Sequence, residues 1–171
     1  MKQMKNRGFT TVELVIVVSI LAIAASIAAL SLRTFLPNMQ LKAATRNLYM
    51  AAMQAKSEAV HRNVNCVLTF NQTVNGLSYP YVVFQDDDGD CEYDGGEPAI
   101  VLAEPLPNEL SVVSNNLPGN DDGQPTIIFR KTTIPMANGG GLVNGKVQLK
   151  NSRNVTSSVV FNQAGNIRID Q

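Results

Sequence analysis

The sequence predicts an α+β fold in which a long N-terminal helix packs on an antiparallel β-sheet head. Residues 14–32 contain no charged side chain, and the apolar residues that follow recur at steps of three and four, the period of an α-helix. From Asn65 onward the pattern changes to short runs of β-branched and aromatic residues separated by turn residues. A length of 171 residues fits one such head together with an anchor.

The first part of the helix, residues 9–32, is expected to span a membrane. Its uncharged run would form a rod of about 28 Å, close to the hydrocarbon thickness of a bilayer. Three basic residues precede it: Lys2, Lys5 and Arg7. They favour a cytoplasmic N-terminus, with the rest of the chain outside. Glu13 is the exception in this segment, because a carboxylate within an apolar helix costs about 2–3 kcal/mol and needs a partner.

The second part, residues 33–62, is expected to continue as an amphipathic helix. Its apolar stripe consists of small and aliphatic residues at helical spacing: Leu41, Ala44, Leu48, Ala52, Ala55 and Ala59. The stripe needs a partner surface, and its alanines would allow the downstream strands to approach closely. Pro37 has no amide proton to donate, so we expect a kink or a local loosening of the helix there.

The head, residues 63–171, is expected to be antiparallel β-structure. The runs that predict strands are residues 65–71, 78–84, 98–104, 109–115, 126–129, 146–150 and 157–161. Residues 165–170 are expected to close the sheet as an edge strand. Turns are predicted at Asn75-Gly76, at residues 138–141 and at Asn144-Gly145, the last as a tight hairpin.

Residues 5–13, KNRGFTTVE, resemble the prepilin leader of type IV pilins and type II secretion pseudopilins. The resemblance implies that a prepilin peptidase removes residues 1–8 by cutting after Gly8 and methylates the new N-terminal Phe9. It also implies that Glu13 pairs with the amine of Phe9 in a neighbouring subunit during assembly. The alternative is an ordinary signal anchor whose glutamate lies near the membrane interface.

Three passages, from the second part of the helix onward, narrow the resemblance to the H-type minor pseudopilins and the FimT/FimU minor pilins. They are residues 41–70, the acidic passage 84–102 and the closing passage 158–169. The resemblance implies a structural subunit that primes or caps a type IV pilus or a type II secretion pseudopilus. The implied partners are other minor and major pilins or pseudopilins, the prepilin peptidase and the inner-membrane assembly platform. The implied location is a single pass through the bacterial inner membrane with a periplasmic head, and then the filament.

Two cysteines, Cys66 and Cys91, fall in the part expected outside the cytoplasm. Their even number and the oxidising compartment favour a disulfide, which would stabilise the head by about 3–4 kcal/mol in the chain-entropy model. Two free thiols are the alternative.

An acidic segment spaces its carboxylates like the ligands of an EF-hand loop. Positions 1, 3, 5, 7, 9 and 12 of that count are Asp86, Asp88, Asp90, Glu92, Asp94 and Glu97. Oxygen ligands in such a ring suit Ca²⁺, which is the one cofactor considered for this chain. Cys91 stands at the sixth place, where an EF-hand needs glycine. The alternative is a solvated acidic turn.

Charge is segregated along the head, with carboxylates between residues 86 and 122 and cations after them. The basic residues are Arg130, Lys131, Lys146, Lys150, Arg153 and Arg168. If the two groups cover different surfaces, stacked subunits would attract each other. DNA is a second candidate partner for the basic group, as in minor pilins used for DNA uptake or adhesion. The ordinary interpretation is six solvated side chains.

No enzymatic activity is expected. The one histidine, His61, lies at the end of the predicted helix, where a cation is favourable on electrostatic grounds alone. The sequence shows neither a nucleophile motif nor a phosphate-binding glycine loop. The remaining alternative to a filament subunit or a DNA-binding minor pilin is a plain membrane-anchored periplasmic β domain.

Overall fold

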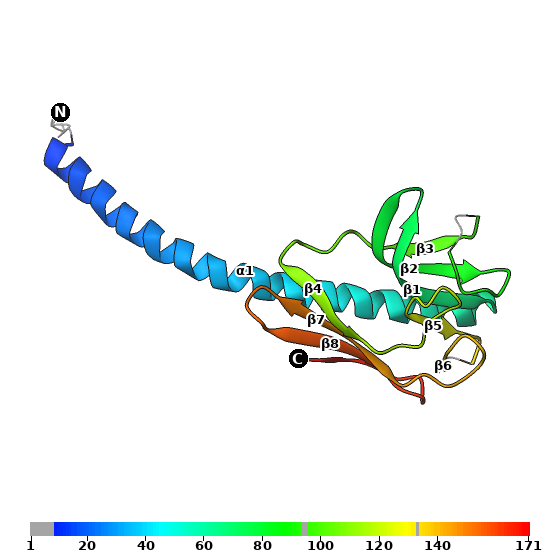
Figure 1. Cartoon of the computed structure of the whole chain (residues 1–171). Coiled ribbons are helices and arrows are strands. Elements are labelled where there is room, and N and C mark those ends of the chain that lie inside the picture. Colours follow the sequence, from blue (N-terminus) through cyan, green and yellow to red (C-terminus); the bar gives the residue numbers. More distant parts are fainter. Residues whose placement is uncertain (1–8, 94–95, 133) are drawn as a thin grey trace, which may run out of the picture. The chain divides into compact units, whose positions relative to one another are not determined.

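The computed structural model describes residues 9–93, 96–132 and 134–171, and it consists of one helix followed by strands (Figure 1). Helix α1 spans Thr11–Arg62. The strands are β1 (Asn65–Val74), β2 (Leu77–Asp86), β3 (Ala99–Leu102), β4 (Leu110–Asn115), β5 (Thr126–Phe129), β6 (Pro135–Met136), β7 (Gly145–Asn151), β8 (Thr156–Phe161) and β9 (Ile167–Asp170). The predicted long helix and antiparallel β-structure are therefore confirmed.

The chain divides into two compact units, Met1–Leu36 and Pro37–Gln171. In the first unit the described part is helical, and all of its described side chains are exposed. Its helix is long and apolar enough to cross a membrane. The second unit contains every buried hydrophobic residue of the described chain, from Leu41 to Phe161. Because this unit carries a complete core, we expect residues 37–171 to fold on their own. From here on, the head means this whole unit, which includes the second part of α1 as well as the strands.

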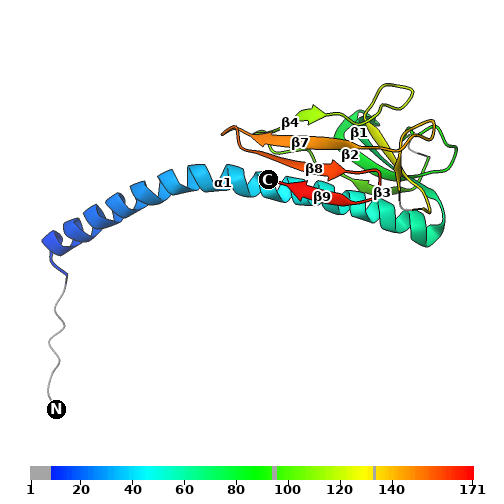
Figure 2. The same ribbon diagram turned by 90° about the horizontal axis from the view of Figure 1, so that it is seen from below.

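The head contains two antiparallel sheets rather than the single sheet that the sequence suggested. One has five strands in the order β3-β2-β1-β5-β6, and the other has four in the order β4-β7-β8-β9. β9 is an edge strand, as predicted, and it runs alongside α1 (Figure 2). The β1–β2 hairpin closes at Asn75-Gly76, where both residues have positive φ values of 51° and 79°. This is the conformation for which an Asn-Gly pair is favoured in two-residue hairpins.

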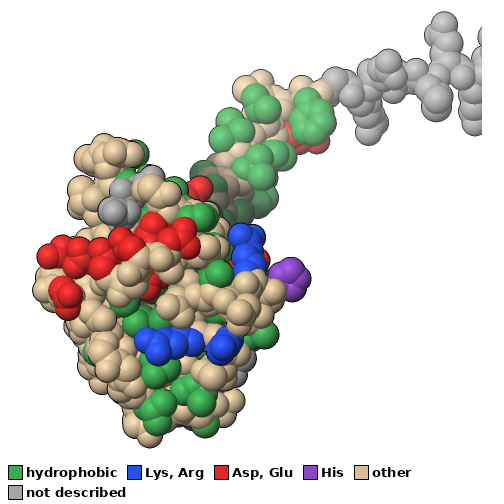
Figure 3. Space-filling model, turned by 90° about the vertical axis from the view of Figure 1, so that its right-hand side faces the viewer, with side chains coloured by type: hydrophobic (Ala, Val, Ile, Leu, Met, Phe, Trp, Pro, Cys, Tyr) green, Lys and Arg blue, Asp and Glu red, His purple; other side chains and the backbone are tan. Residues whose placement is uncertain are grey.

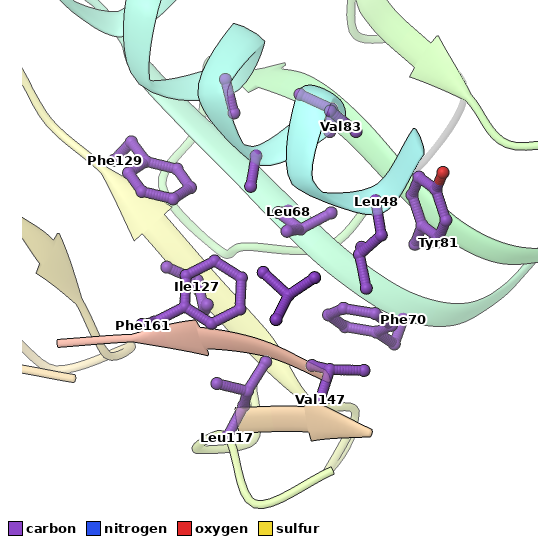
Figure 4. Packing of buried hydrophobic residues seen from close by; sticks show 14 of the residues in the cluster. Leu48, Leu68, Phe70, Tyr81, Val83, Leu117, Ile127, Phe129, Val147 and Phe161 are labelled. Atoms are coloured by element: carbon purple, nitrogen blue, oxygen red, sulfur yellow. The ribbon is translucent and has the colours of Figure 1, made fainter. Parts of the chain in front are cut away.

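The core lies where α1 meets the inner faces of both sheets (Figure 4). The predicted stripe is buried: Ala52, Ala55 and Ala59 are 0% exposed. Figure 4 shows Leu48 of α1 beside Leu68 and above Phe70, both of β1, while Phe161 of β8 lies next to Ile127 across the core. Alanines leave room for the strands to come close to the helix backbone, so one helix face contacts residues from both sheets.

Two local predictions need correction. Asn144-Gly145 does not form a hairpin, because Gly145 is the first residue of β7. A Cβ at Gly145 would lie 2.6 Å from the Leu117 side chain, so glycine serves a close approach there rather than a turn. The short strand β6 was not predicted. As expected, helix α1 continues through Pro37, which is buried and stands at the boundary of the two units.

Replacement of a stripe alanine should destabilise the head. Ala55→Leu adds three carbon atoms to a side chain that is fully buried, and the extra volume overpacks the core. We therefore expect the free energy of unfolding to fall by about 1–3 kcal/mol. The measurement is urea denaturation of residues 37–171. Ser57→Leu on the exposed side of the same helix is the matched control and should change stability by less than about 0.5 kcal/mol. Equal midpoints for the two variants would contradict the packing described here.

Candidate assembly site and head surfaces

Glu13 closes a hydrogen-bonded cap at the start of α1. The helix begins at Thr11, so Thr10 is the N-cap residue and Glu13 is the third residue of the helix. The Glu13 amide donates to Thr10 Oγ1 at 3.2 Å. In return, the Thr10 amide and hydroxyl donate to Glu13 Oε2 at 2.9 and 3.0 Å. This reciprocal arrangement is a capping box.

This capping role of Glu13 was not predicted, although its signal is present in the sequence. Thr10-Thr11-Val12-Glu13 has the spacing Thr-x-x-Glu immediately before an apolar run, which is the pattern of a capping box. The carboxylate therefore has partners within its own subunit. Both of the bonds that it accepts end on Oε2.

The predicted cleavage site lies at the edge of the described chain. Gly8 falls outside the described residues, and Phe9 is 80% exposed. From Phe9 to Leu36 the exposed large side chains are almost all aliphatic, among them Val15, Leu21 and Ile27. Such a surface is expected of a helix that lies in lipid or among other apolar helices, since it has no cover within its own unit.

The predicted disulfide between Cys66 and Cys91 is wrong for this structure, in which both cysteines are free and buried. Side chains alternate between the two faces of a strand. Cys66 of β1 lies with Leu68 in the core beneath α1, whereas its neighbour Val67 lies in a separate cluster with Cys91. The five-stranded sheet therefore separates the two thiols.

The acidic segment is organised by backbone hydrogen bonds. Asp86 is 7% exposed, and its Oδ1 accepts from the Gly89 amide at 2.9 Å. Burial raises the pKa of Asp86, and the negative charges of Asp88 and Asp90 add to that effect, while hydrogen bonds from the Gly89 and Cys91 amides oppose it. Cys91 has a φ of 65°, so this residue adopts the left-handed conformation for which an EF-hand uses glycine at its sixth place.

Part of the predicted calcium ligand set comes together. Ligand oxygens of Asp86, Asp88 and Glu97 lie within 4.8 Å of one another. Asp90 and Glu92 are not in this group, and Asp94 lies outside the described residues. Asp90 Oδ1 instead accepts from the Glu92 amide at 2.8 Å, which is turn chemistry. Calcium binding stays a prediction.

A second acidic loop lies beside the first. The Asn120 side-chain amide donates to the Cys91 carbonyl at 3.3 Å, and the Asp122 amide donates to Glu92. Together the loops form a surface that we call the acidic patch: Asp87, Asp88, Asp90, Glu92, Asp121 and Asp122. Figure 3 shows acidic side chains gathered in a row at this end of the head.

The six predicted basic residues do not form one surface. Arg130 and Lys131 follow β5 and line a hollow of about 480 Å³ together with Asn63 and Asn65, at the same end of the head as the acidic patch. Arg153 lies in the turn between β7 and β8. The other three cations lie on the four-stranded sheet.

Those three cations share the outer face of that sheet. In β7, Val147 and Leu149 are buried toward the core, so Lys146 and Lys150 point to the other face. Opposite residues of an antiparallel pair share a face. Since Val160 pairs with Lys146 on one side and with Arg168 on the other, Arg168 lies on the same face as Lys146. We call Lys146, Lys150 and Arg168 the basic face.

Comparison with known protein families agrees with this architecture. Residues 44–166 match the family described as type II transport protein GspH, and residues 3–29 match the prokaryotic N-terminal methylation motif. The chain belongs to the GspH family. No curated protein and no solved structure matches it. Membership confirms the resemblance to pilin-like minor pseudopilins, and GspH is a family of structural subunits rather than of enzymes.

The family match and the helix together indicate a membrane-anchored pilin-like protein. The methylation motif covers the predicted cleavage site and the apolar part of α1, whereas the GspH match covers the head. The methylation motif therefore falls largely on the unit whose described side chains are exposed, and the GspH match falls on the unit that has a buried core. A protein of this family works with other pilin-like subunits of a secretion or pilus system.

Both thiols should be unreactive in the folded head. Burial raises the pKa of Cys66 to about 11 and that of Cys91 to about 12, so each thiol is protonated at pH 8. Iodoacetamide at pH 8 should therefore modify neither cysteine until denaturant is added, as followed by intact mass. A mass lower by two hydrogens, restored by reductant, would instead demonstrate a disulfide.

The same thiols give the head a pH dependence. Their pKa values in the folded state exceed the ordinary value of 9.0, so the stability that they contribute is fully present below pH 9.0. It is lost as the pH rises through about 11, because the unfolded chain releases these protons first. Cys66→Ala should weaken this loss, measured as the free energy of unfolding from pH 8 upward.

Proposed function

We propose that this protein is a minor subunit that primes or caps a type II secretion pseudopilus or a related pilus. The precursor waits in the inner membrane with its N-terminus in the cytoplasm and its head in the periplasm. The prepilin peptidase removes residues 1–8, and the subunit then enters the filament through the apolar part of α1. The observation that carries this proposal is a GspH-family head joined to an exposed apolar helix with one capped carboxylate near its start.

The capped carboxylate explains how one group serves both membrane insertion and assembly. In the subunit alone, Thr10 donates two hydrogen bonds to Glu13 Oε2 and lowers the free-energy cost of a carboxylate in the bilayer. Cleavage after Gly8 creates an ammonium group on Phe9. We propose that this ammonium of a neighbouring subunit donates to Glu13 Oε1 while the cap on Oε2 stays in place.

Glu13→Gln separates the charge of Glu13 from its capping role. Glutamine at the third helical position also completes a capping box, so the variant keeps the helix start but loses the negative charge. We expect the variant to be inserted in the membrane and processed normally, and its amount in sheared filaments to fall at least tenfold. The measurement is quantitative immunoblotting of membrane and filament fractions from cells with the native assembly machinery.

Thr10→Ala is the matched control, because it removes both hydrogen bonds of the Thr10 hydroxyl and keeps the charge of Glu13. This variant should enter filaments at a level closer to that of the wild type than Glu13→Gln does. Normal incorporation of Glu13→Gln would show that the charge of Glu13 is not needed for assembly. Failure of Thr10→Ala together with normal Glu13→Gln would assign Glu13 to capping alone.

Binding of double-stranded DNA by the head is a second candidate function, favoured by the basic face. Lys146, Lys150 and Arg168 lie on one face of the four-stranded sheet among polar neighbours such as Gln148 and Thr156. A phosphate backbone attracts such a surface whatever its sequence. Asp170, which pairs with Ser158 in the same sheet, carries a carboxylate. Its negative charge weakens the attraction for phosphate.

The DNA hypothesis predicts a defined salt dependence. If three phosphates are neutralised, log K against log salt should have a slope of about −3 for a duplex, measured by fluorescence anisotropy with the isolated head. Lys146→Glu with Lys150→Glu should abolish binding. Lys42→Glu with Arg46→Glu changes the net charge equally on α1 and should retain it. No binding by the wild-type head at low salt would exclude this function.

A further inference from the structure

The chain enters the head at Pro37, and a turn of the four-stranded sheet lies at the same end. The Asn151 side-chain amide donates to Asn38 Oδ1 at 2.8 Å, so the end of β7 is held to the first turn of α1 within the head. Residues 152–155 then connect β7 to β8, and Figures 1 and 2 show this turn at the end of the head opposite Arg62. We call this region the entry end: Asn38, Met39, Lys42, Ser152, Arg153 and Val155.

A short stretch of chain ties the entry end to the apolar part of α1. The uncharged run ends at Leu32, and residues 33–36 lead to Pro37. Five residues reach about 18 Å when fully extended and about 8 Å as a helix. The polar headgroup layer of a bilayer is roughly 5–8 Å thick on each side of the hydrocarbon core. Chain length alone therefore keeps the entry end close to the lipid headgroups when the apolar part of α1 spans a membrane.

Exposed cations and exposed apolar side chains lie together at the entry end. Lys42 and Arg153 are exposed, and neither forms an ion pair with any residue that the structure describes. Met39 is 53% exposed and Val155 is 46% exposed. Cations attract the phosphate groups of anionic lipids, and apolar side chains beside them favour the boundary between headgroups and acyl chains. The entry end has both features of a surface that lies on a membrane.

Two carboxylates nearby weaken the attraction for an anionic surface. Glu109 Oε2 accepts from the Ser152 hydroxyl at 3.2 Å, and Asp170 is the last residue of the edge strand β9. Two further cations compensate for them: Arg46, one helical turn after Lys42, and Lys150, beside Asn151 in β7. Cations therefore remain in excess around the entry end.

The opposite end of the head carries the acidic patch. The patch lies there because β1 begins at Asn65, directly after α1 ends, and Asn65 pairs with Asp86, which the acidic segment follows. An anionic surface repels the patch and attracts the entry end, so both forces favour the same orientation of the head.

We propose that the entry end binds the headgroups of anionic phospholipids in the leaflet from which the apolar part of α1 emerges. Lys42 and Arg153 donate to phosphate oxygens, while Met39 and Val155 contact the acyl boundary. The bilayer thus holds the head with its acidic patch directed away from the membrane, and the contact is lost when the subunit leaves the bilayer. The inference needs the membrane-anchored state of the proposed function and does not need its priming or capping role.

The test uses the full chain in phosphatidylcholine vesicles that contain either no phosphatidylglycerol or about 30 mol% of it. Vesicles are floated after an alkaline wash, so that only inserted protein is measured. An NBD fluorophore is attached either at Ser152→Cys or at His61→Cys, an exposed position about 35 Å from Asn38 along α1. Intact mass verifies one label per chain, since Cys66 and Cys91 are buried. A nitroxide on the lipid headgroups quenches a fluorophore that lies close to them.

Phosphatidylglycerol should increase quenching of the label at position 152 at least about twofold, because it draws the entry end onto the leaflet. Quenching of the label at position 61 should stay unchanged or decrease. The increase should disappear at about 0.5 M salt, since exposed charges are then screened over a few ångströms. Equal quenching at position 152 in the two kinds of vesicle would overturn the proposal.

Two charge-reversal variants locate the contact. Lys42→Glu with Arg153→Glu changes the entry end and should remove the increase at position 152. Arg130→Glu with Lys131→Glu makes the same change in net charge at the opposite end and should retain it. An increase that persists in the first variant, or that is lost equally in both, would overturn the proposal.

Two controls keep these outcomes interpretable. The unfolding midpoint of each variant is measured on residues 37–171, and Lys42→Gln with Arg153→Gln takes the place of the first variant if that midpoint falls. The vesicles contain no assembly machinery, so either result leaves the priming or capping role and the role of Glu13 untouched.

Discussion

Burial of one alanine-rich face of α1 between two sheets is the interaction on which the head depends. Ala52, Ala55 and Ala59 are fully buried, and they allow β1 and β8 to approach the same helix from different sheets. The contact sets where everything else lies: β9 comes beside α1, and the β2–β3 loop comes to the Arg62 end, where it contributes to the acidic patch. A larger residue on this face would displace both segments.

The same helix has two environments, and the change between them explains the division of the chain. Before Pro37 the described side chains of α1 are exposed and mostly apolar, a state that is stable only in lipid or within a bundle of similar helices. After Pro37 one face is buried by the head's own strands. The cap that joins Thr10 and Glu13 lies in the first environment, whereas the residues that match the GspH family lie in the second. Anchoring and head function are therefore separable by mutation.

Local patterns predicted the elements, whereas contacts between distant residues did not follow from them. The helical stripe and most strands were predicted because their periods reflect which side is buried. That the two thiols are free was not predicted, because the surroundings of each face of β1 depend on the strands that pair with it. One of these strands, β5, is some sixty residues away in the sequence. The pair Asn144-Gly145 predicts a turn, because the contact of Gly145 with Leu117 is not visible in the sequence. The bond from the Asn151 side chain to Asn38 Oδ1 at 2.8 Å, which ties β7 to α1, is equally non-local.

The most direct test of the account is the intact mass of the protein recovered from its native membrane. We expect a chain that lacks residues 1–8 and carries one added methyl group on Phe9, as the methylation motif over residues 3–29 implies. That result would place the apolar part of α1 in the mature protein and make Phe9 the source of the ammonium that meets Glu13. A full-length, unmethylated chain would contradict the account and leave a membrane-anchored β domain with the same fold.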